Sequence, residues 1–293
     1  MSGDSAARRA YRAILNLGAK TMGAERAKRA DAWLRFGRRL DLNNPKSLAD
    51  KVSWLELYGD QQAAARYTDK FGVREYIEAK GLKDILVPVC GGPWDSVDQV
   101  DLDSLPDQFA LKATHGCEMN LICANKSQLD KDLAMREIGQ WLKKDYPRSS
   151  VEPHYKLIPH RVYAEEYIGV VGDIIDYKIH CINGNPSFIL VCSEREKSLK
   201  LNLYDVDWKP IPGLQGPQKN GHEIERPADL SEMLKIARRL SEDFEFVRVD
   251  LYDIDGKIRF GELTFSPAAC VFPYFTDEFI AKWGEVLHVE CFD

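Results

Sequence analysis

Hydrophobic and polar positions alternate most clearly near the carboxyl end of the chain. β-Branched and aromatic residues at 246–252 and 258–263 flank a turn at 253–256 that contains Asp255-Gly256, which is typical of a β-hairpin. Asp250 and Glu262 stand near the paired ends of these strands, so their carboxylates could share one hard cation such as Mg²⁺. Arg248, two residues before Asp250, projects from the same face. The alternative is that both acids are polar positions on a solvated hairpin face.

The same pattern predicts the other elements of the chain. Apolar spacing typical of helices covers 48–58, 67–77, 129–146 and 230–244, and the first forty residues predict two helices broken near 18–23. Strands are predicted at 85–89, 161–168, 172–182 and 187–192, with a strand, a loop and a strand within 108–123 and a hairpin turn at Asn183-Gly184. The segment 201–208 is expected to help complete a β-rich larger subdomain. No internal repeat or Pro/Ser-rich linker is evident. We therefore expect a helical N-terminal segment, 1–84, followed by one continuous folded unit, 85–293.

Composition narrows the class of protein without selecting it. A chain of 293 residues that is 44% hydrophobic and 29% charged can bury a sizeable core in one large or two modest domains. The net charge of −6 argues against a general nucleic-acid binder. The seven cysteines form no Cys-x-x-Cys pair and leave an odd count, so neither a zinc site nor a disulfide framework is indicated. Reduced thiols in a cytosol are then the default. No apolar run approaches the roughly 20 residues that span a bilayer, and the N-terminus lacks the apolar core of a signal peptide. We expect a cytoplasmic protein.

Basic residues are concentrated in two contexts. The predicted N-terminal helices have basic outer faces, which are either solvated or form a patch for an anionic glycan, a membrane surface or a partner. Lys112 closes a strand just before a loop that contains Gly116, whose backbone N–H groups could cover phosphate. His115 in that loop is a candidate for substrate or phosphate binding, or a hydrogen-bonded loop histidine. Lys178 lies on an apolar strand, where a phosphate partner would relieve the cost of a buried ammonium.

The run Glu262-Leu263-Thr264-Phe265-Ser266-Pro267 resembles the closing motif of ATP-grasp enzymes. In that superfamily an Arg-x-Asp strand and a hairpin precede Glu-x-Asn and a Ser-Pro turn; Arg248 and Asp250 match the first part. Thr264 departs from the pattern because it stands where most members carry the metal-binding Asn, which puts the second metal position in doubt. The resemblance is closest to the TupA-like branch, associated with bacterial surface (capsular) polysaccharide and teichuronopeptide synthesis. The segment 42–58, LNNPKSLADKVSWLELY, also resembles the entry segment of that family.

This resemblance implies an α+β fold, a two-lobed nucleotide clamp with a smaller lobe at 85–160 and a larger lobe at 161–293. It implies ATP and Mg²⁺ as cofactors, the cation being held by Asp250, Glu262 and Thr264. Residues expected to bind the nucleotide are the lysines that face phosphate and the strand end that holds the adenine and sugar: Lys70, Lys112, His115, Glu165, Glu166, Tyr167, Ile168 and Lys178. Glu165 and Glu166 are adjacent on a strand, so they point to opposite sides and differ in role.

The family resemblance further implies an ATP-dependent ligase that activates a carboxylate as an acyl phosphate and joins it to an amine. Arg248, Lys178 and Arg195, the last in a charged loop that could cover the acceptor, are the expected catalytic residues. The substrates would be a small-molecule or glycan carboxylate and an amine, such as a uronic acid and an amino acid, and membrane-associated polysaccharide machinery is a further expected contact. Two alternatives stay open: a sugar phosphotransferase, and a non-catalytic nucleotide- or glycan-binding protein. The residues identify neither substrate, nor whether the acceptor is a free sugar, a nucleotide sugar or a polymer, nor the oligomeric state.

Overall fold

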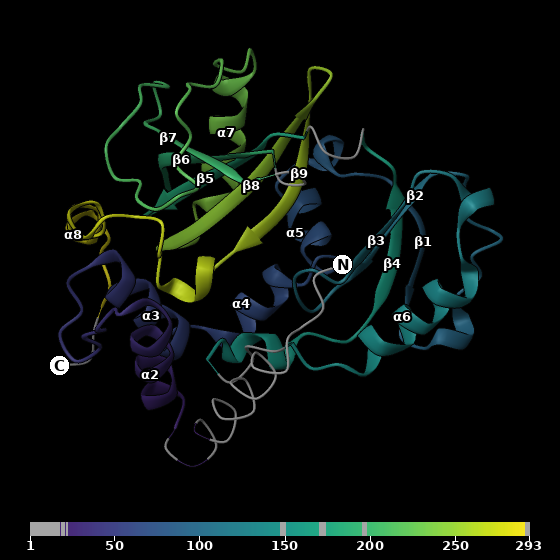
Figure 1. The fold of residues 1–293 in the computed structure, drawn as a ribbon, viewed down its shortest axis with the longest axis horizontal. Coiled ribbons are helices and arrows are strands. Elements are labelled where there is room, and N and C mark those ends of the chain that lie inside the picture. The colour runs from purple at the N-terminus through teal and green to yellow at the C-terminus, as the bar shows by residue number, and fades with distance from the viewer. Residues whose placement is uncertain are drawn as a thin grey trace.

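The computed structural model describes residues 18, 21, 23–146, 151–169, 174–194 and 198–290. Two antiparallel sheets stand side by side, and helices α4 and α5 lie between them (Figure 1). The helices are α2 Ala24–Phe36, α3 Leu48–Tyr58, α4 Gln61–Thr68, α5 Val73–Ala79, α6 Lys131–Lys143, α7 Leu230–Ser241 and α8 Asp277–Val286. The strands are β1 Val89–Trp94, β2 Phe109–Ala113, β3 Asn120–Cys123, β4 Val162–Glu166, β5 Asp176–Ile182, β6 Asn185–Ser193, β7 Lys200–Tyr204, β8 Phe246–Ile254 and β9 Lys257–Thr264.

The smaller sheet has four strands in the order β1-β4-β2-β3. One face packs on α6, where Ala134 and Ile138 bury against Phe109, Leu111 and neighbouring strand residues. β4 pairs with both β1 and β2, so this sheet extends across residue 160, where we expected the lobes to divide, as far as residue 166.

The larger sheet has five strands in the order β7-β6-β5-β8-β9 and is covered on both faces. Odd-numbered residues of β5, β6 and β8, such as Ile179 and Val249, pack with the apolar stripe of α7. Even-numbered residues on the opposite face, such as Phe188 and Phe246, pack with α3 and α8. Burial on both sides explains why every residue of β5 is buried.

Local sequence signals set several element boundaries as predicted. Ser47 and Asp50 form a reciprocal capping box that starts α3, and the helix covers the predicted range 48–58. Asn183 and Gly184 have φ angles of 49° and 73°, which permits the predicted two-residue turn between β5 and β6.

Two predicted elements were wrong. The helix predicted over 67–77 is two helices, because Asp69 turns its carboxylate back to accept from the backbone N–H groups of Phe71 and Gly72 and interrupts the helical bonding. The strand predicted at 85–89 is a short 3₁₀ turn at Lys83–Ile85 followed by β1, which begins only at Val89. Pro88 precedes it, and proline cannot donate to a ladder. The first of the two predicted N-terminal helices lies outside the described residues; the second is α2.

We also searched the described helices for one that could span a membrane. Among the described residues, no helix combines the length and the apolar character needed to cross a bilayer.

Candidate active site

The β8–β9 hairpin brings the two predicted metal-binding carboxylates together. Asp250 is paired directly with Glu262 across the two strands, as the sequence predicted. A bulge follows immediately, and Gly261 occupies it; a Cβ there would come within 2.9 Å of the Tyr252 ring and 3.1 Å of the Asp250 carbonyl oxygen. The bulge sets the direction of Glu262 next to the site, a common use of this irregularity.

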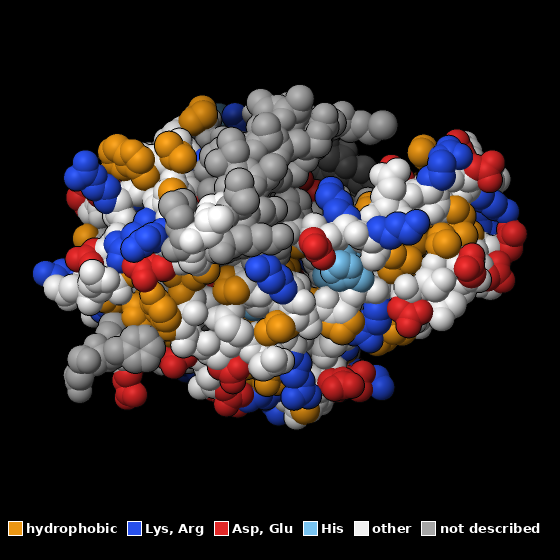
Figure 2. Space-filling model, turned by 90° about the horizontal axis from the view of Figure 1, so that it is seen from below, with side chains coloured by type: hydrophobic (Ala, Val, Ile, Leu, Met, Phe, Trp, Pro, Cys, Tyr) orange, Lys and Arg blue, Asp and Glu red, His pale blue; other side chains and the backbone are white. Residues whose placement is uncertain are grey.

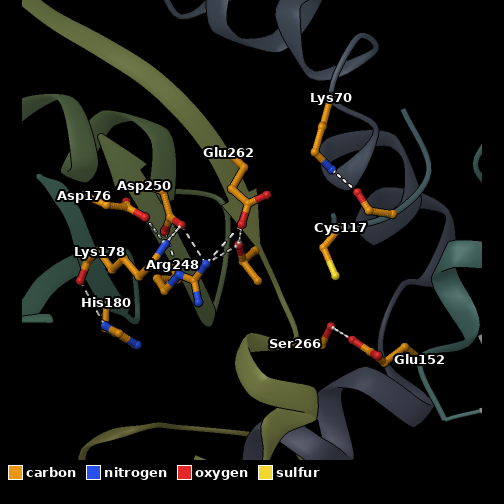
Figure 3. A network of polar contacts seen from close by, with 12 residues as sticks. Lys70, Cys117, Glu152, Asp176, Lys178, His180, Arg248, Asp250, Glu262 and Ser266 are labelled. Atoms are coloured by element: carbon orange, nitrogen blue, oxygen red, sulfur yellow. Dashed lines mark hydrogen bonds and ion pairs between the residues drawn. The ribbon is translucent and has the colours of Figure 1, made fainter. Parts of the chain in front are cut away.

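One nitrogen of Arg248 donates to three oxygen atoms that converge on it (Figure 3). Its Nη2 is 2.6 Å from Asp250 Oδ2, 3.1 Å from Glu262 Oε1 and 3.0 Å from the Thr264 hydroxyl. Thr264 in turn donates to Glu262 Oε1 at 3.0 Å. These are the three residues predicted to bind a metal ion. A cationic group of the protein therefore occupies the position at which their oxygens meet.

A second cation, Lys178 on β5, completes the charged network. Its ammonium pairs with Asp250, its cross-strand neighbour, and lies 2.8 Å from Asp176. Burial and the nearby Arg248 oppose the charge on Lys178, but Asp176 and Asp250 outweigh them and raise its pKa. The period-2 rule could have identified Asp176, because it lies two residues before Lys178 on the same face.

His180 is the neutral neighbour of this network. Its ring is fully buried, opposite Arg248 on the next strand, and Nδ1 is 3.1 Å from the Lys178 carbonyl oxygen. Burial, followed by the charge of Arg248, lowers the pKa of His180 well below its usual value. The imidazole therefore stays uncharged beside the two cations.

The donor set fits a hard divalent cation. Asp250, Glu262 and Thr264 offer only oxygen, and they already bind one positive group together, although that group must leave before a metal ion enters. Across the described residues no cluster of three or more His, Cys, Asp or Glu side chains is arranged to hold a metal. With two carboxylates and a hydroxyl, most of the coordination shell would come from water and phosphate, as is usual for Mg²⁺.

A second charged cluster lies on the smaller sheet, around Glu165. This buried carboxylate pairs with Lys112 at 2.5 Å and Arg74 at 3.3 Å, and it accepts from the Tyr163 hydroxyl at 3.2 Å. The adjacent Glu166 is exposed, so the two acids point to opposite sides as predicted. The structure thus brings Lys112 together with Glu165.

The segment after Glu166 leaves the sheet. Tyr167 and Ile168 follow the end of β4 and are partly exposed. The backbone N–H of Glu166 donates to the Pro88 carbonyl oxygen at 2.9 Å, so it is engaged within the protein. Nucleotide binding by Glu166, Tyr167 and Ile168 stays a prediction.

The loop between β2 and β3 is fixed by Lys70 on one side and α6 on the other. The Lys70 ammonium is 2.5 Å from the Gly116 carbonyl oxygen. His115 is fully buried, stacks on His160, and places Nε2 3.1 Å from the Trp141 carbonyl oxygen of α6. Burial, and then the neighbouring His160, lower the pKa of His115 to about 4. Of the two roles open for His115, these contacts favour the hydrogen-bonded loop histidine.

The turn after β9 adds features that the sequence did not reveal. The Ser266 hydroxyl donates to Glu152 at 2.7 Å, below the Arg248 network in Figure 3. Ala268, Ala269 and Cys270 then take left-handed φ angles of 51°, 55° and 64°. Each such residue costs about 1–2 kcal/mol, and strain of this kind clusters at functional sites. Glu152 comes from a distant segment, and no local pattern marked it.

The predicted residues thus form separate groups on the two sheets. Arg248, Lys178, Asp250, Glu262 and Thr264 are joined in one network on the larger sheet. Lys112 and Glu165 belong to the cluster on the smaller sheet, and Lys70 binds the loop beside it. Arg195 lies outside the described residues.

The structure has two antiparallel sheets, with the Asp250–Glu262 hairpin on the larger sheet and Lys112 on the smaller one. This α+β arrangement agrees with the ATP-grasp fold class expected from the sequence. A family model described as TupA-like ATPgrasp matches residues 50–288, which is most of the chain. The protein belongs to the TupA-like ATP-grasp family, and the resemblance and fold class predicted from sequence are confirmed.

Solved structures give distant matches. N5-carboxyaminoimidazole synthetase from Staphylococcus aureus is 11% identical over 68% of this chain and 44% of its own, with a TM-score of 0.39. D-alanine–D-alanine ligase from Bacillus anthracis, in complex with ATP, is 15% identical over 75% of this chain and 62% of its own, with a TM-score of 0.40. The corresponding ligase from Helicobacter pylori is 14% identical over 82% and 66%, with a TM-score of 0.43. The chain spans less than half of the synthetase. No curated protein matches it.

Proposed function

We propose that the protein is an ATP-dependent carboxylate–amine ligase. The observation that carries this proposal is the convergence of Asp250, Glu262 and Thr264 on one cationic group, in a chain of the TupA-like ATP-grasp family. A carboxylate at neutral pH is a poor electrophile, whereas its mixed anhydride with phosphate has a good leaving group.

The proposed reaction has two balanced steps. A carboxylate oxygen attacks the γ-phosphorus of ATP, and the bond to the β-phosphate oxygen breaks to release ADP. The amine nitrogen then attacks the acyl carbon, the carbon–oxygen bond to phosphate breaks, and the nitrogen loses a proton. The products are an amide, ADP and inorganic phosphate, and no covalent bond to the protein is needed.

Residues of the chain would act by position and charge. Asp250, Glu262 and Thr264 would hold Mg²⁺, which when bound supplies positive charge to the ATP phosphates. Lys112 and Lys178 would face phosphate oxygens, and Arg248 would stabilise the negative charge that develops during transfer. The buried environment of Arg248 and Lys178 supports this, because charge interactions are stronger where water is excluded.

We further propose that the acid is a uronic acid or an amino acid and that the product is an amide in bacterial surface polysaccharide synthesis. Family membership supports this assignment, and the geometry of the site is compatible with any carboxylate acceptor. The sugar phosphotransferase and the non-catalytic binding protein remain the alternatives that an experiment must separate.

The test is product analysis with panels of uronic acids and amino acids. Release of ADP only when an acid and an amine are both supplied, with formation of the amide, supports ligation. ADP release with one hydroxylated sugar would instead indicate a kinase, and ATP binding without turnover would indicate a binding protein.

A pair of variants ties the activity to the site. Glu262→Gln keeps size and hydrogen bonding but removes the charge that a hard cation needs, so we expect turnover to fall at least about a hundredfold, on the order of 3 kcal/mol in the barrier. Asp255→Asn removes the same charge from the exposed turn of the same hairpin, where asparagine accepts the φ of 52°. This control should keep parental turnover. Equal activity of both variants would remove Glu262 from the mechanism.

A further inference from the structure

Charge is unevenly distributed along this chain. The first 46 residues contain 11 Lys and Arg but 4 Asp and Glu, an excess of seven positive charges. The whole chain contains 40 Lys and Arg and 46 Asp and Glu, so the remaining residues carry an excess of 13 negative charges. Segregation of this kind is typical of a segment that meets an anionic partner.

Helix α2, Ala24–Phe36, lies within the described residues of this basic segment, and its inner face packs against the rest of the protein. Ala27, Lys28, Asp31 and Ala32 are buried. The Lys28 ammonium pairs with Glu56 of α3 and lies 3.4 Å from the Val151 carbonyl oxygen. The helix is therefore held in one orientation, which determines the face that it turns outward.

The outer face of α2 carries two large apolar side chains, and basic side chains lie beside them. Trp33 is 49% exposed and Leu34 is 66% exposed, and Arg26 and Ala30 continue the same helical stripe toward the N-terminal end. The Arg39 guanidinium lies over the Trp33 ring at 5.0 Å.

The arginines differ in how fully they are neutralised. Arg29 and Arg35 pair with acids one turn earlier on α2, and Arg38 pairs with Asp277. Arg26 and Arg39 are exposed and, among the described residues, form no ion pair. Figure 2 views the side of the molecule on which α2 lies in Figure 1, and hydrophobic and basic side chains adjoin one another on its left part.

We infer that α2 docks this protein on a negatively charged lipid bilayer. Arg26 and Arg39, which have no ion pair in the part of the chain that the structure describes, would meet anionic headgroups, while Trp33 and Leu34 would enter the boundary between headgroups and acyl chains. Tryptophan is enriched at that boundary because it has an apolar body and a polar N–H. An anionic glycan would satisfy the arginines but give no reason for a leucine that is two-thirds exposed. A lipid surface accounts for both.

Cosedimentation of the full chain with vesicles tests this inference. We expect binding to vesicles with about one third phosphatidylglycerol, much weaker binding to pure phosphatidylcholine, and loss of binding near 0.5 M salt. Trp33→Ser with Leu34→Ser should lower the partition constant at least about tenfold. Arg26→Gln with Arg39→Gln should lower it by a similar factor, since each basic residue near the surface contributes about fivefold.

A matched control is Leu133→Ser, which removes another leucine that is 41% exposed, on α6. It should bind vesicles as the parent does, and thermal melts should show all four proteins folded. Equal binding to both vesicle types, or binding unaffected by either double substitution, would overturn the inference. A third outcome would also overturn the inference: the parent fails to bind vesicles, but the parent and the Trp33/Leu34 variant bind soluble dextran sulfate equally well. That result would assign the surface to an anionic polymer.

Discussion

Lys112 pairs with the Glu165 carboxylate, which has other hydrogen-bonding partners as well. Glu165 keeps Arg74 and the Tyr163 hydroxyl as partners when Lys112 turns toward another anion. Lys112→Met should therefore fold, because methionine preserves much of the aliphatic stem. Since the lost group is expected to meet only phosphate, ATP and ADP should bind at least about tenfold more weakly while adenosine binding changes little.

Calorimetric titration of the three ligands checks this expectation. Lys131→Met is the matched control, because it removes a lysine of the same lobe that pairs with the exposed Asp103. Unchanged ATP affinity in Lys112→Met would mean that the β2–β3 loop does not grip phosphate.

Buried histidines make stability depend on pH at the residue scale. Burial lowers the pKa of His115 to about 4, against an ordinary value near 6.5, so the unfolded chain binds more protons between these values. The stabilising contribution is complete above pH 6.5 and is lost as the pH falls toward 4. His154, whose pKa burial lowers to about 3, acts in the same direction.

His115→Gln should thus flatten the fall in the free energy of unfolding between pH 6.5 and 4. The slope should decrease by up to about 1.4 kcal/mol per pH unit, the value for one proton. Urea denaturation of both proteins across this range measures it. Parallel curves would show that His115 is not neutral in the folded state.

At this scale, the sequence predicted the groups that lie two residues apart on a strand or opposite one another across a hairpin. Arg248, Asp250 and Glu262 were found in this way, and the register confirms their pairing. The partners of Lys112 and Ser266 were not found, because Glu165 and Glu152 come from segments that only tertiary structure brings near.

At the scale of elements, the contact between α3 and α8 requires a glycine, Gly284 of α8, because there is no room for a side chain at this position. A Cβ on Gly284 would lie 2.2 Å from the Lys46 carbonyl oxygen and 2.7 Å from the Leu48 nitrogen. These are backbone atoms at the N-cap of α3, so they cannot rotate away. Gly284→Ala should destabilise the protein by about 3 kcal/mol or more.

The control is Gly139→Ala in α6, where a Cβ would meet nothing within 4 Å. It should leave stability unchanged or raise it by up to about 1 kcal/mol, because alanine favours a helix. Denaturant midpoints of the two variants compare the sites directly. Equal midpoints would show that α3 and α8 can separate without cost.

Element boundaries were predictable where a local signal decided them. Ser47 and Asp50 fixed the start of α3, whereas the break between α4 and α5 depends on Asp69, which also pairs with Arg161. The break itself comes from the Asp69 carboxylate, which accepts from the backbone N–H groups of Phe71 and Gly72. That polar contact does not alter the apolar spacing, so apolar spacing alone could not reveal the break.

At the scale of the whole molecule, a buried ion pair ties the N-terminal helix to the rest of the chain. Lys28 and Glu56 are almost fully buried, and the Cys270 thiol donates to the same carboxylate at 3.4 Å. Removing one partner leaves an uncompensated buried charge, so Lys28→Met should cost about 3–5 kcal/mol.

The double variant Lys28→Met/Glu56→Leu should be less destabilised than the sum of the two single variants. A double-mutant cycle by chemical denaturation measures this coupling. Additive effects would mean that α2 is held by its apolar contacts alone.

The position of Arg248 has a thermodynamic consequence. A metal ion entering among Asp250, Glu262 and Thr264 must exchange with the guanidinium, so the free energy of breaking those contacts is subtracted from its affinity. Phosphate would give the displaced guanidinium a new partner, which makes metal ion and nucleotide each strengthen the binding of the other. We expect Mn²⁺, followed by electron paramagnetic resonance, to bind several-fold more tightly when ADP is present. In Arg248→Gln that linkage should shrink, and an undiminished linkage would show that the two positive charges do not compete.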